Sequence, residues 1–276
     1  MAVNYGLPFV LKRKMKKTIL LAAAAAILMT TSCAEKKQTL RIVTYNVGVF
    51  HKADINSIPM VSDMMKEIDA DVMGINELDS CTVRTGGEYQ IESFAKAMGD
   101  WNFRYASTID YQGGKYGIGV ASKPKFEILS FHKIPLPRGG QEEPRALAVA
   151  EFRDFILATT HLDYTSDAVQ TSQADAVSSY LKDKYGDCGK AVFLTGDMNA
   201  APESAAMIRY KKDWTILSAQ DYTIPAVNPR LCIDYIMLLN GTAECKVLET
   251  AVLTEFKKGD VKIASDHLPV MAVVQF

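Results

Sequence analysis

The stretch Ala191-Val192-Phe193-Leu194-Thr195-Gly196-Asp197-Met198-Asn199 joins an apolar run to two polar side chains. Residues 191–195 have the length and composition of a buried β-strand, and Asp197 and Asn199 follow it directly. Because residues two apart on an extended chain face the same side, this carboxylate and this amide would project together. The stretch therefore predicts a polar site at the end of a buried strand.

Similar strings recur along the chain. They are Thr44-Tyr45-Asn46-Val47, Asn76-Glu77-Leu78-Asp79, Tyr116-Gly117-Ile118-Gly119-Val120-Ala121-Ser122, Thr160-His161-Leu162-Asp163, Ile233-Asp234-Tyr235 and Ser265-Asp266-His267-Leu268-Pro269-Val270. All but the string that begins at Tyr116 place an Asn, a carboxylate or a His at the end of an apolar run. A series of this kind, which closes with an adjacent Asp-His pair, predicts one polar site assembled from many strand ends.

The order of the expected elements favours two β-sheets with helices outside them. Strands are expected at residues 39–47, 71–75, 103–107, 117–122, 126–134, 146–152, 155–160, 191–195, 232–239, 246–253 and 270–276, and helices at residues 58–68, 88–98, 166–185 and 203–210. Ser166 is the expected N-cap of the longest helix. Since helices are spread throughout and several strand pairs read as hairpins, mixed sheets fit better than a purely parallel fold.

Residues 1–32 are expected to be a signal peptide. Basic residues at 12–14 and 16–17 precede an apolar run at 19–29, and Thr31-Ser32-Cys33 closes it. The leader resembles a bacterial lipoprotein signal, with Cys33 as the lipid-bearing residue, residues 33–39 as a tether and residues 40–276 as the folded domain. Thr30 stands where such signals usually have Leu, so ordinary secretion with an incidental Cys33 is the alternative.

Loss of this leader leaves an acidic domain. The chain of 276 residues is 48% hydrophobic and 23% charged, and removing five Lys and Arg residues changes its formal net charge from −1 to −6. An acidic domain lacks the basic field that drives sequence-independent binding of nucleic acid. Nucleic acid is therefore a possible partner but not the favoured one.

Four cysteines remain after the leader, namely Cys81, Cys188, Cys232 and Cys245. None belongs to a C-x-x-C pair, so a zinc site is not expected. In an exported protein they could form up to two disulfides, and buried free thiols are the equal alternative.

Carboxylates delivered by buried strands need a cation or a hydrogen-bond donor nearby. Glu77 and Asp197 both follow apolar runs, and Asp266 adds a third carboxylate. Hard oxygen ligands of this kind suit Mg²⁺, Mn²⁺ or Ca²⁺ rather than a metal that prefers thiolates.

Taken in order, the strings T-Y-N, N-E, Y-G-x-G-V-A-S, T-H-L-D, G-D-M-N, I-D-Y and S-D-H-L-P-V resemble those of the endonuclease/exonuclease/phosphatase superfamily, over roughly residues 40–276. Each string is weak by itself, but together and in this order they are specific. The resemblance implies a four-layer α/β (α+β) sandwich, in which two mixed, largely antiparallel sheets pack face to face with helices on their outer faces. It also implies hydrolysis of phosphate esters with a divalent metal, in the manner of the deoxyribonuclease-like enzymes.

For the metal, the resemblance implies Glu77 as the principal ligand, with Asn46 beside it and Asp266 completing the shell. The plainer alternatives are that Asn46 only bonds its own turn and that Glu77 is a surface residue without a ligand. Tyr116 and Arg145 occupy motif positions as candidate substrate contacts. Core packing for Tyr116 and a structural ion pair for Arg145 are at least as well supported.

For catalysis, the resemblance implies that Asp197 orients or deprotonates the attacking water and that Asn199 holds a phosphate oxygen. His267 would stabilise the transition state or protonate the leaving oxygen, with Asp234 fixing its ring. His161 would contact the phosphate, although a His after a strand often only bonds a backbone carbonyl. Asp163 reads more readily as a helix-side cap than as part of the site.

These residues predict a monomeric, exported phosphoesterase of the periplasm, the outer membrane or the cell surface, held at the membrane only by its lipid anchor. A small phosphodiester, a sugar phosphate or a lipid headgroup is the expected substrate. The alternatives are a secreted nuclease and a surface lipoprotein that keeps the fold for binding without turnover.

Overall fold

The computed structural model describes residues 1–3, 37–140 and 143–276. Apart from residues 1–3, the predicted signal peptide at 1–32 lies outside the described residues, as do Cys33 and most of the predicted tether at 33–39. Within the described ranges, no helix is long and apolar enough to cross a membrane.

The first sheet has six strands in the order β11-β12-β1-β2-β4-β3. Its strands are β1 (Thr39–Asn46), β2 (Val72–Ser80), β3 (Asn102–Tyr111), β4 (Gly114–Ser122), β11 (Lys246–Val252) and β12 (Val270–Gln275). β1 and β2 run parallel, and every other neighbouring pair is antiparallel. The carboxyl ends of β1 and β2 therefore lie side by side.

The second sheet also has six strands, in the order β5-β6-β7-β8-β10-β9. They are β5 (Ser130–Pro135), β6 (Ala146–Glu151), β7 (Phe155–His161), β8 (Ala191–Asp197), β9 (Trp214–Ile216) and β10 (Asp234–Leu239). Among the described strands of this sheet, β7 and β8 form the one parallel pair, with His161 opposite Asp197 in the register. Each sheet thus places the ends of two parallel strands together.

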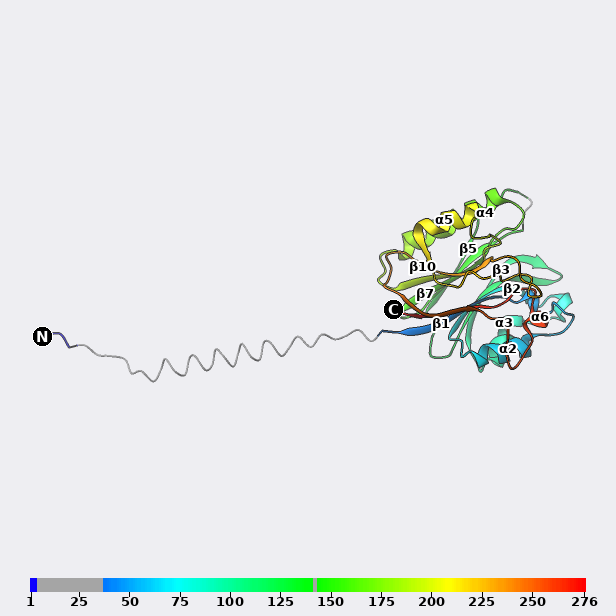
Figure 1. The fold of residues 1–276 in the computed structure, drawn as a ribbon, viewed down its shortest axis with the longest axis horizontal. Helices are drawn as coiled ribbons and strands as arrows, with labels where there is room; N and C mark the ends of the chain where they lie inside the picture. Colours follow the sequence, from blue (N-terminus) through cyan, green and yellow to red (C-terminus); the bar gives the residue numbers. More distant parts are fainter. Residues whose placement is uncertain (4–36, 141–142) are drawn as a thin grey trace. The chain divides into compact units, whose positions relative to one another are not determined.

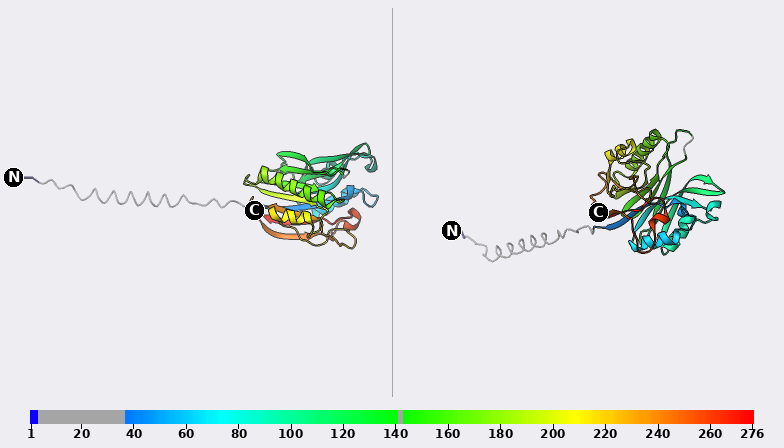
Figure 2. Two further views of the ribbon diagram at one scale, coloured as in Figure 1. Left: turned by 90° about the horizontal axis from the view of Figure 1, so that it is seen from above. Right: turned by 45° about the vertical axis from the view of Figure 1, so that its right-hand side comes forward.

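Helices cover the outer face of each sheet (Figure 1). α2 (Ile58–Glu67), α3 (Gln90–Ala97) and α6 (Val261–Ala264) lie on the side of the first sheet, and α4 (Asp167–Tyr185) and α5 (Ala205–Asp213) lie on the side of the second. Figure 2 shows α4 and α5 side by side over their sheet. Ser166 caps α4 as predicted, since its side chain accepts a hydrogen bond from the backbone of Val169. The predicted four-layer sandwich of two mixed sheets is confirmed.

Alternation along the strands divides most of the buried apolar side chains of the described residues among three large hydrophobic clusters, beside a small fourth one. In β1, Leu40 and Ile42 join the core between the two sheets, whereas Val43 and Tyr45 pack beneath α2 and α3. β7 and β8 divide their side chains in the same way between the central core and the core beneath α4. Successive side chains of a strand point to opposite faces of its sheet, so a sheet that is buried on both faces needs apolar residues at successive positions.

The two sheets approach each other closely at Gly74 of β2. A Cβ atom at this position would overlap the hydroxyl of Thr195 on β8 and would crowd Thr159 on β7. A residue without a side chain therefore lets the backbone of β2 come close to the second sheet. This close approach brings the strand ends of both sheets toward one site.

Some boundaries differ from the sequence prediction. β2 does not end before Glu77 but continues to Ser80, because the chain absorbs an extra residue in an irregularity between Ile75 and Leu78. β9 and α6 were not predicted, since segments of three and four residues are too short to show a period. Cys81, Cys188, Cys232 and Cys245 are all free thiols.

Candidate active site

The site lies where the carboxyl ends of the two parallel strand pairs meet. Asn76, which lies in β2 just before Glu77, ties the sheets together at this point. Its side-chain nitrogen donates to the carbonyl of Thr160 (3.0 Å), and its side-chain oxygen accepts from the backbone N–H of Asp197 (2.9 Å). Asn76 is fully buried, so these bonds fix the strand ends against each other.

Glu77 enters the site from the irregular part of β2. Its φ is 57°, in the left-handed region that a residue with a side chain adopts rarely. The bulge re-aims a side chain that a regular strand would direct elsewhere, and Glu77 is left half-buried beside Asn46. The backbone strain at this position supports a functional role for the side chain.

Asn46, at the end of β1, connects the predicted metal ligand to the predicted catalytic residues. Its side-chain nitrogen lies 3.0 Å from Glu77 Oε1, 3.0 Å from Asp197 Oδ2 and 3.3 Å from His267 Nε2. Its oxygen accepts from the backbone N–H of Gly48 (3.1 Å). In this orientation Asn46 directs its side-chain N–H groups into the site. Its side-chain oxygen, the atom that would bind a metal, is instead hydrogen-bonded to the turn at Gly48.

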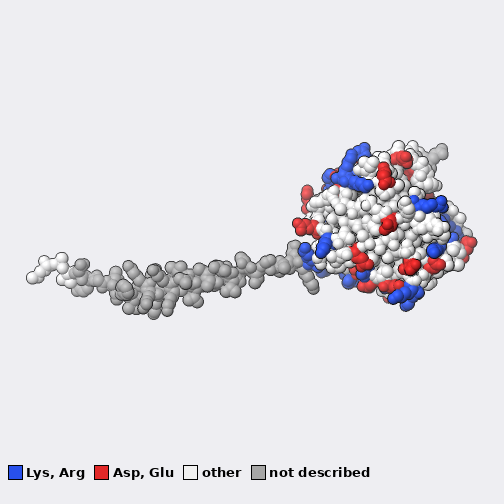
Figure 3. All heavy atoms as spheres, in the orientation of Figure 1, with Lys and Arg blue, Asp and Glu red and all other residues white. Residues whose placement is uncertain are grey.

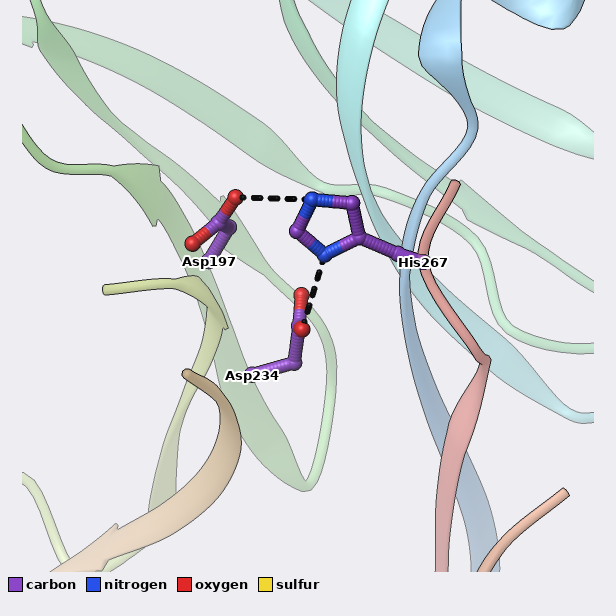
Figure 4. Close-up of side chains that lie close together, drawn as sticks. All are labelled: Asp197, Asp234 and His267. Atoms are coloured by element: carbon purple, nitrogen blue, oxygen red, sulfur yellow. Dashed lines mark hydrogen bonds and ion pairs between the residues drawn. The ribbon is translucent and has the colours of Figure 1, made fainter. Parts of the chain in front are cut away.

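His267 lies between two carboxylates, as Figure 4 shows. Nδ1 is 2.9 Å from Asp234 Oδ2, and Nε2 is 3.5 Å from Asp197 Oδ2. Thr223 donates to the same oxygen of Asp234 (2.5 Å), which fixes the carboxylate that orients the ring. All four side chains are buried.

Protonation of this cluster follows from its charges. Burial alone would lower the pKa of His267, but the negative charges of Asp234 and Asp197 raise it to about 10. Burial, followed by the charge of Asp234, raises the pKa of Asp197 to about 7, because the His267 imidazolium and the hydrogen bonds from Asn199 and Asn46 offset only part of the rise. One imidazolium cannot neutralise two buried carboxylates, so Asp197 is the group that can exchange a proton near neutral pH.

Asp197, Asp234 and His267 offer ligand atoms that all lie within 4.8 Å of one another, as a metal site would require. Both ring nitrogens of His267, however, already face carboxylate oxygens, and the raised pKa of the ring keeps them protonated. A protonated ring nitrogen has no lone pair to give to a metal. The trio is therefore better suited to acid–base chemistry and orientation than to holding a metal.

His161 and Asn199 complete the surroundings of Asp197. His161 Nε2 lies 3.4 Å from Asp197 Oδ2, and its Nδ1 is buried without a hydrogen-bond partner among the described residues. Burial, together with the positive charges of Arg145 and His267, holds the pKa of His161 well below its usual range. The backbone N–H of Asn199 donates to Asp197 Oδ1 (2.8 Å), and its side-chain nitrogen donates to the carbonyl of Leu162 (3.0 Å).

The remaining predicted residues lie around this centre. Asp266 Oδ2 forms an ion pair with Lys52 Nζ (2.6 Å), and its Oδ1 is buried without a hydrogen-bond partner among the described residues. Arg145 is buried, and its Nη1 lies 3.2 Å from Glu143 Oε1. Burial, followed by the charges of Glu77 and Glu143, raises the pKa of Tyr116.

Asp163 stands apart from the catalytic cluster as a cap. Its Oδ1 accepts from the backbone of Thr165 and Ser166 (2.8 Å each) at the entry to α4, as the sequence suggested.

Two residues near the site were not found from the sequence. Lys52 lies in the loop after Asn46 and forms an ion pair with Asp266, far along the chain. No local sequence pattern therefore indicates that Lys52 lies near the site. Arg84 follows β2 in the short 3₁₀-helix η2 (Val83–Thr85) and forms a two-pronged ion pair with the buried Asp79. The Asp79–Arg84 spacing is local, and a buried carboxylate followed by an arginine in a turn could have indicated it.

The sequence matches the Endonuclease/Exonuclease/phosphatase family over residues 43–267. Comparison with curated proteins gave no match. Among solved structures, a protein of the same family from Bacteroides thetaiotaomicron has a TM-score of 0.70 at 18% identity, over 87% of this chain and 96% of its own. A mannosyl-6-phosphatase from that organism has a TM-score of 0.70 at 18% identity, over 86% of this chain and 100% of its own.

The catalytic domain of human Nocturnin, with a bound sulfate anion, has a TM-score of 0.65 at 13% identity, over 86% of this chain and 97% of its own. At these identities the likeness to solved structures shows the fold alone. The family match is of another kind, because it covers most of the sequence and spans the polar strand-end residues from Asn46 to His267. The chain belongs to the endonuclease/exonuclease/phosphatase family.

Proposed function

We propose that this chain is an exported, divalent-metal-dependent phosphoesterase that hydrolyses small phosphate esters by attack of water. The observation that carries the proposal is the contact of one side chain, Asn46, with Glu77, Asp197 and His267. It joins a candidate metal ligand to the acid–base residues in one buried site. The family match supports a phosphoesterase, and the similar fold of a mannosyl-6-phosphatase supports a small substrate.

The oxygen atoms of the site fit a hard divalent cation such as Mg²⁺ or Mn²⁺. Asn46 bonds only Oε1 of Glu77, and Asp266 Oδ1 is a buried oxygen without a hydrogen-bond partner among the described residues. A buried unpaired carboxylate oxygen is costly unless a cation or a donor meets it. Glu77 and Asp266 would hold the ion, which when bound would polarise a phosphoryl oxygen and neutralise developing charge.

Asp197 and His267 supply the proton transfers. With a pKa of about 7, Asp197 can accept a proton from an attacking water and release it again. His267 carries a proton over the whole neutral range because its pKa is about 10, so it can donate to a phosphoryl oxygen or to the leaving oxygen. Asp234 fixes the ring, and Asn199 and His161, which both adjoin Asp197, would donate to a phosphate bound there.

The charges around the domain favour a small ester over duplex nucleic acid. On the face that Figure 3 shows, Lys and Arg side chains alternate with Asp and Glu side chains rather than forming a continuous basic band. Close to the site, Lys52, Arg84 and Arg145 each pair with a carboxylate. Extended phosphate backbones are bound by unpaired basic surfaces.

Removal of metal is expected to abolish turnover. Protein treated with EDTA should hydrolyse p-nitrophenyl phosphate and bis-p-nitrophenyl phosphate at least about 100-fold more slowly than protein supplied with Mg²⁺ or Mn²⁺, because the ion stabilises charge in the transition state. Glu77→Gln should require a higher metal concentration for half-maximal rate, with the exposed Glu249→Gln as the matched control. Full activity in excess EDTA would contradict the proposal.

The exported, lipid-anchored location is a further proposal that rests on the leader sequence. A basic start, an apolar centre and Thr31-Ser32-Cys33 support processing at Cys33. When the full chain is expressed in a bacterium that processes lipoproteins, labelled palmitate should enter the protein. Cys33→Ser should abolish the label, whereas Cys188→Ser should retain it. Equal labelling of both variants would contradict the anchor at Cys33.

A further inference from the structure

Arg84 is held rigidly beside the candidate active site. Its Nε lies 2.6 Å from Asp79 Oδ2 and its Nη2 lies 2.8 Å from Asp79 Oδ1. Asp79 is fully buried and accepts a further bond from Thr82 Oγ1 (2.6 Å). A two-pronged contact with a fixed carboxylate sets both the position and the plane of the guanidinium.

Two tyrosines of the β3–β4 hairpin complete this feature. The guanidinium carbon of Arg84 lies 4.5 Å from the ring centre of Tyr111 and 5.6 Å from that of Tyr116. Gln112, at the tip of the hairpin, binds the turn that carries Arg84, since its side chain accepts from the backbone N–H of Arg84 (2.9 Å). The hairpin and the turn therefore form one preorganised wall.

This wall adjoins the candidate metal and phosphate centre. Tyr116 lies directly opposite Asp79 in the β2–β4 pairing, and Glu77 is two residues before Asp79 on β2. A group attached to a phosphate at the centre could reach Tyr116 and Arg84 on this side.

The N–H groups of Arg84 that Asp79 does not take are suited to bind hydroxyl groups of a ligand. Asp79 takes two of the five N–H groups that a guanidinium offers, and the rest can donate to a ligand. Because Asp79 also balances the charge of Arg84, a second phosphate would gain little here. Tyr111 is 36% exposed beside the Arg84 side chain, which is 34% exposed, and its hydroxyl accepts from the side chain of Gln112 (3.5 Å).

We propose that Arg84, Tyr111 and Tyr116 form a subsite for the hydroxyl-rich ring of a sugar phosphate, next to the phosphate centre. The proposal rests on the proposed function, since it names the substrate class of the same site. Arg84 acts here as a specificity-determining residue that binds the part of the ester remote from phosphorus. Its contribution is to the discrimination between esters, not to the chemistry at the phosphate.

The test compares two monoesters that differ in the attached group. The ratio of kcat/KM for mannose 6-phosphate to kcat/KM for p-nitrophenyl phosphate is measured with Mg²⁺ for the wild type, Arg84→Lys, Tyr111→Ala and Arg209→Lys. Loss of well-placed hydrogen bonds to a substrate hydroxyl should lower this ratio at least about tenfold in Arg84→Lys. Tyr111→Ala should lower it too, and Arg209→Lys, on α5, should leave it unchanged.

An unchanged ratio in Arg84→Lys overturns the subsite. An equal fall in the ratio measured with 1-naphthyl phosphate, a ring monoester without hydroxyl groups, also overturns the assignment to a sugar ring, because the wall would then bind any flat ring. If Arg84→Lys fails to fold by circular dichroism, Tyr111→Ala decides the question, since its side chain is exposed.

Failure of the proposed function itself is recognised separately. If no ester is hydrolysed with any metal, calorimetric binding of mannose 6-phosphate to the wild type and to the variants decides the subsite. A dissociation constant at least about tenfold weaker in Arg84→Lys supports it. Equal constants, or no binding to the wild type, overturn it.

Discussion

Replacing His267 with alanine is expected to lower kcat by about 10²–10⁴-fold, the range that a positioned acid–base group supplies. The substitution removes an imidazolium that lies between Asp234 and Asp197. The phosphoryl oxygens then lose a donor at the moment when charge develops on them. Initial rates on p-nitrophenyl phosphate at saturating Mg²⁺ would measure the loss.

The same substitution should change the pH dependence. The charge of His267 lowers the pKa of Asp197, which burial and Asp234 raise to about 7. Without the imidazolium this pKa rises further, and a carboxylate serves as a base only above its pKa. The deficit of His267→Ala should therefore be largest near neutral pH and should shrink as the pH rises.

His132→Ala is the matched control, since His132 lies on β5 and pairs with Glu151 away from the site. It should retain wild-type kcat. A loss smaller than about tenfold in His267→Ala, with the fold intact by circular dichroism, would contradict the assigned role.

Much of the fold could be predicted because its strands are buried on both faces. Runs such as residues 191–195 are apolar at successive positions, and this is the property that places them inside a sandwich. The register and the order of the strands carry no such local signal. They depend on contacts such as that of Gly74 with Thr195 and Thr159, between residues far apart in the sequence.

The candidate site was predictable in its members but not in its geometry. Asp197 and His267 stand in recognisable strings, and the structure brings them together with Asn46. The direction of the Asn46 amide could not be read from the sequence, because it is set by the backbone N–H of Gly48. The bulge at Glu77 is likewise a response of the backbone to its neighbours in the sheet.

Replacing Asp197 with asparagine is expected to lower kcat by about 10²–10⁴-fold without loss of the fold. Asp197 accepts from Asn46 through Oδ2 and from the backbone of Asn199 through Oδ1. An asparagine keeps only one acceptor, and it cannot take a proton from water. The rate on p-nitrophenyl phosphate is the measurement, and Asp175→Asn, on the solvent side of α4, is the matched control.

Stability separates a catalytic role for Asp197 from a structural one. On folding its pKa rises from the usual range of a carboxyl to about 7, so the ionised side chain lowers the stability of the native state as the pH rises from about 4 to about 7. Above that range Asp197→Asn avoids the penalty of a buried, incompletely neutralised charge. Its melting temperature at pH 8 should therefore be no lower than that of the wild type, while its kcat is lower. A collapse of the melting temperature, or a kcat within about tenfold of the wild type, would contradict the assignment of Asp197 as the base.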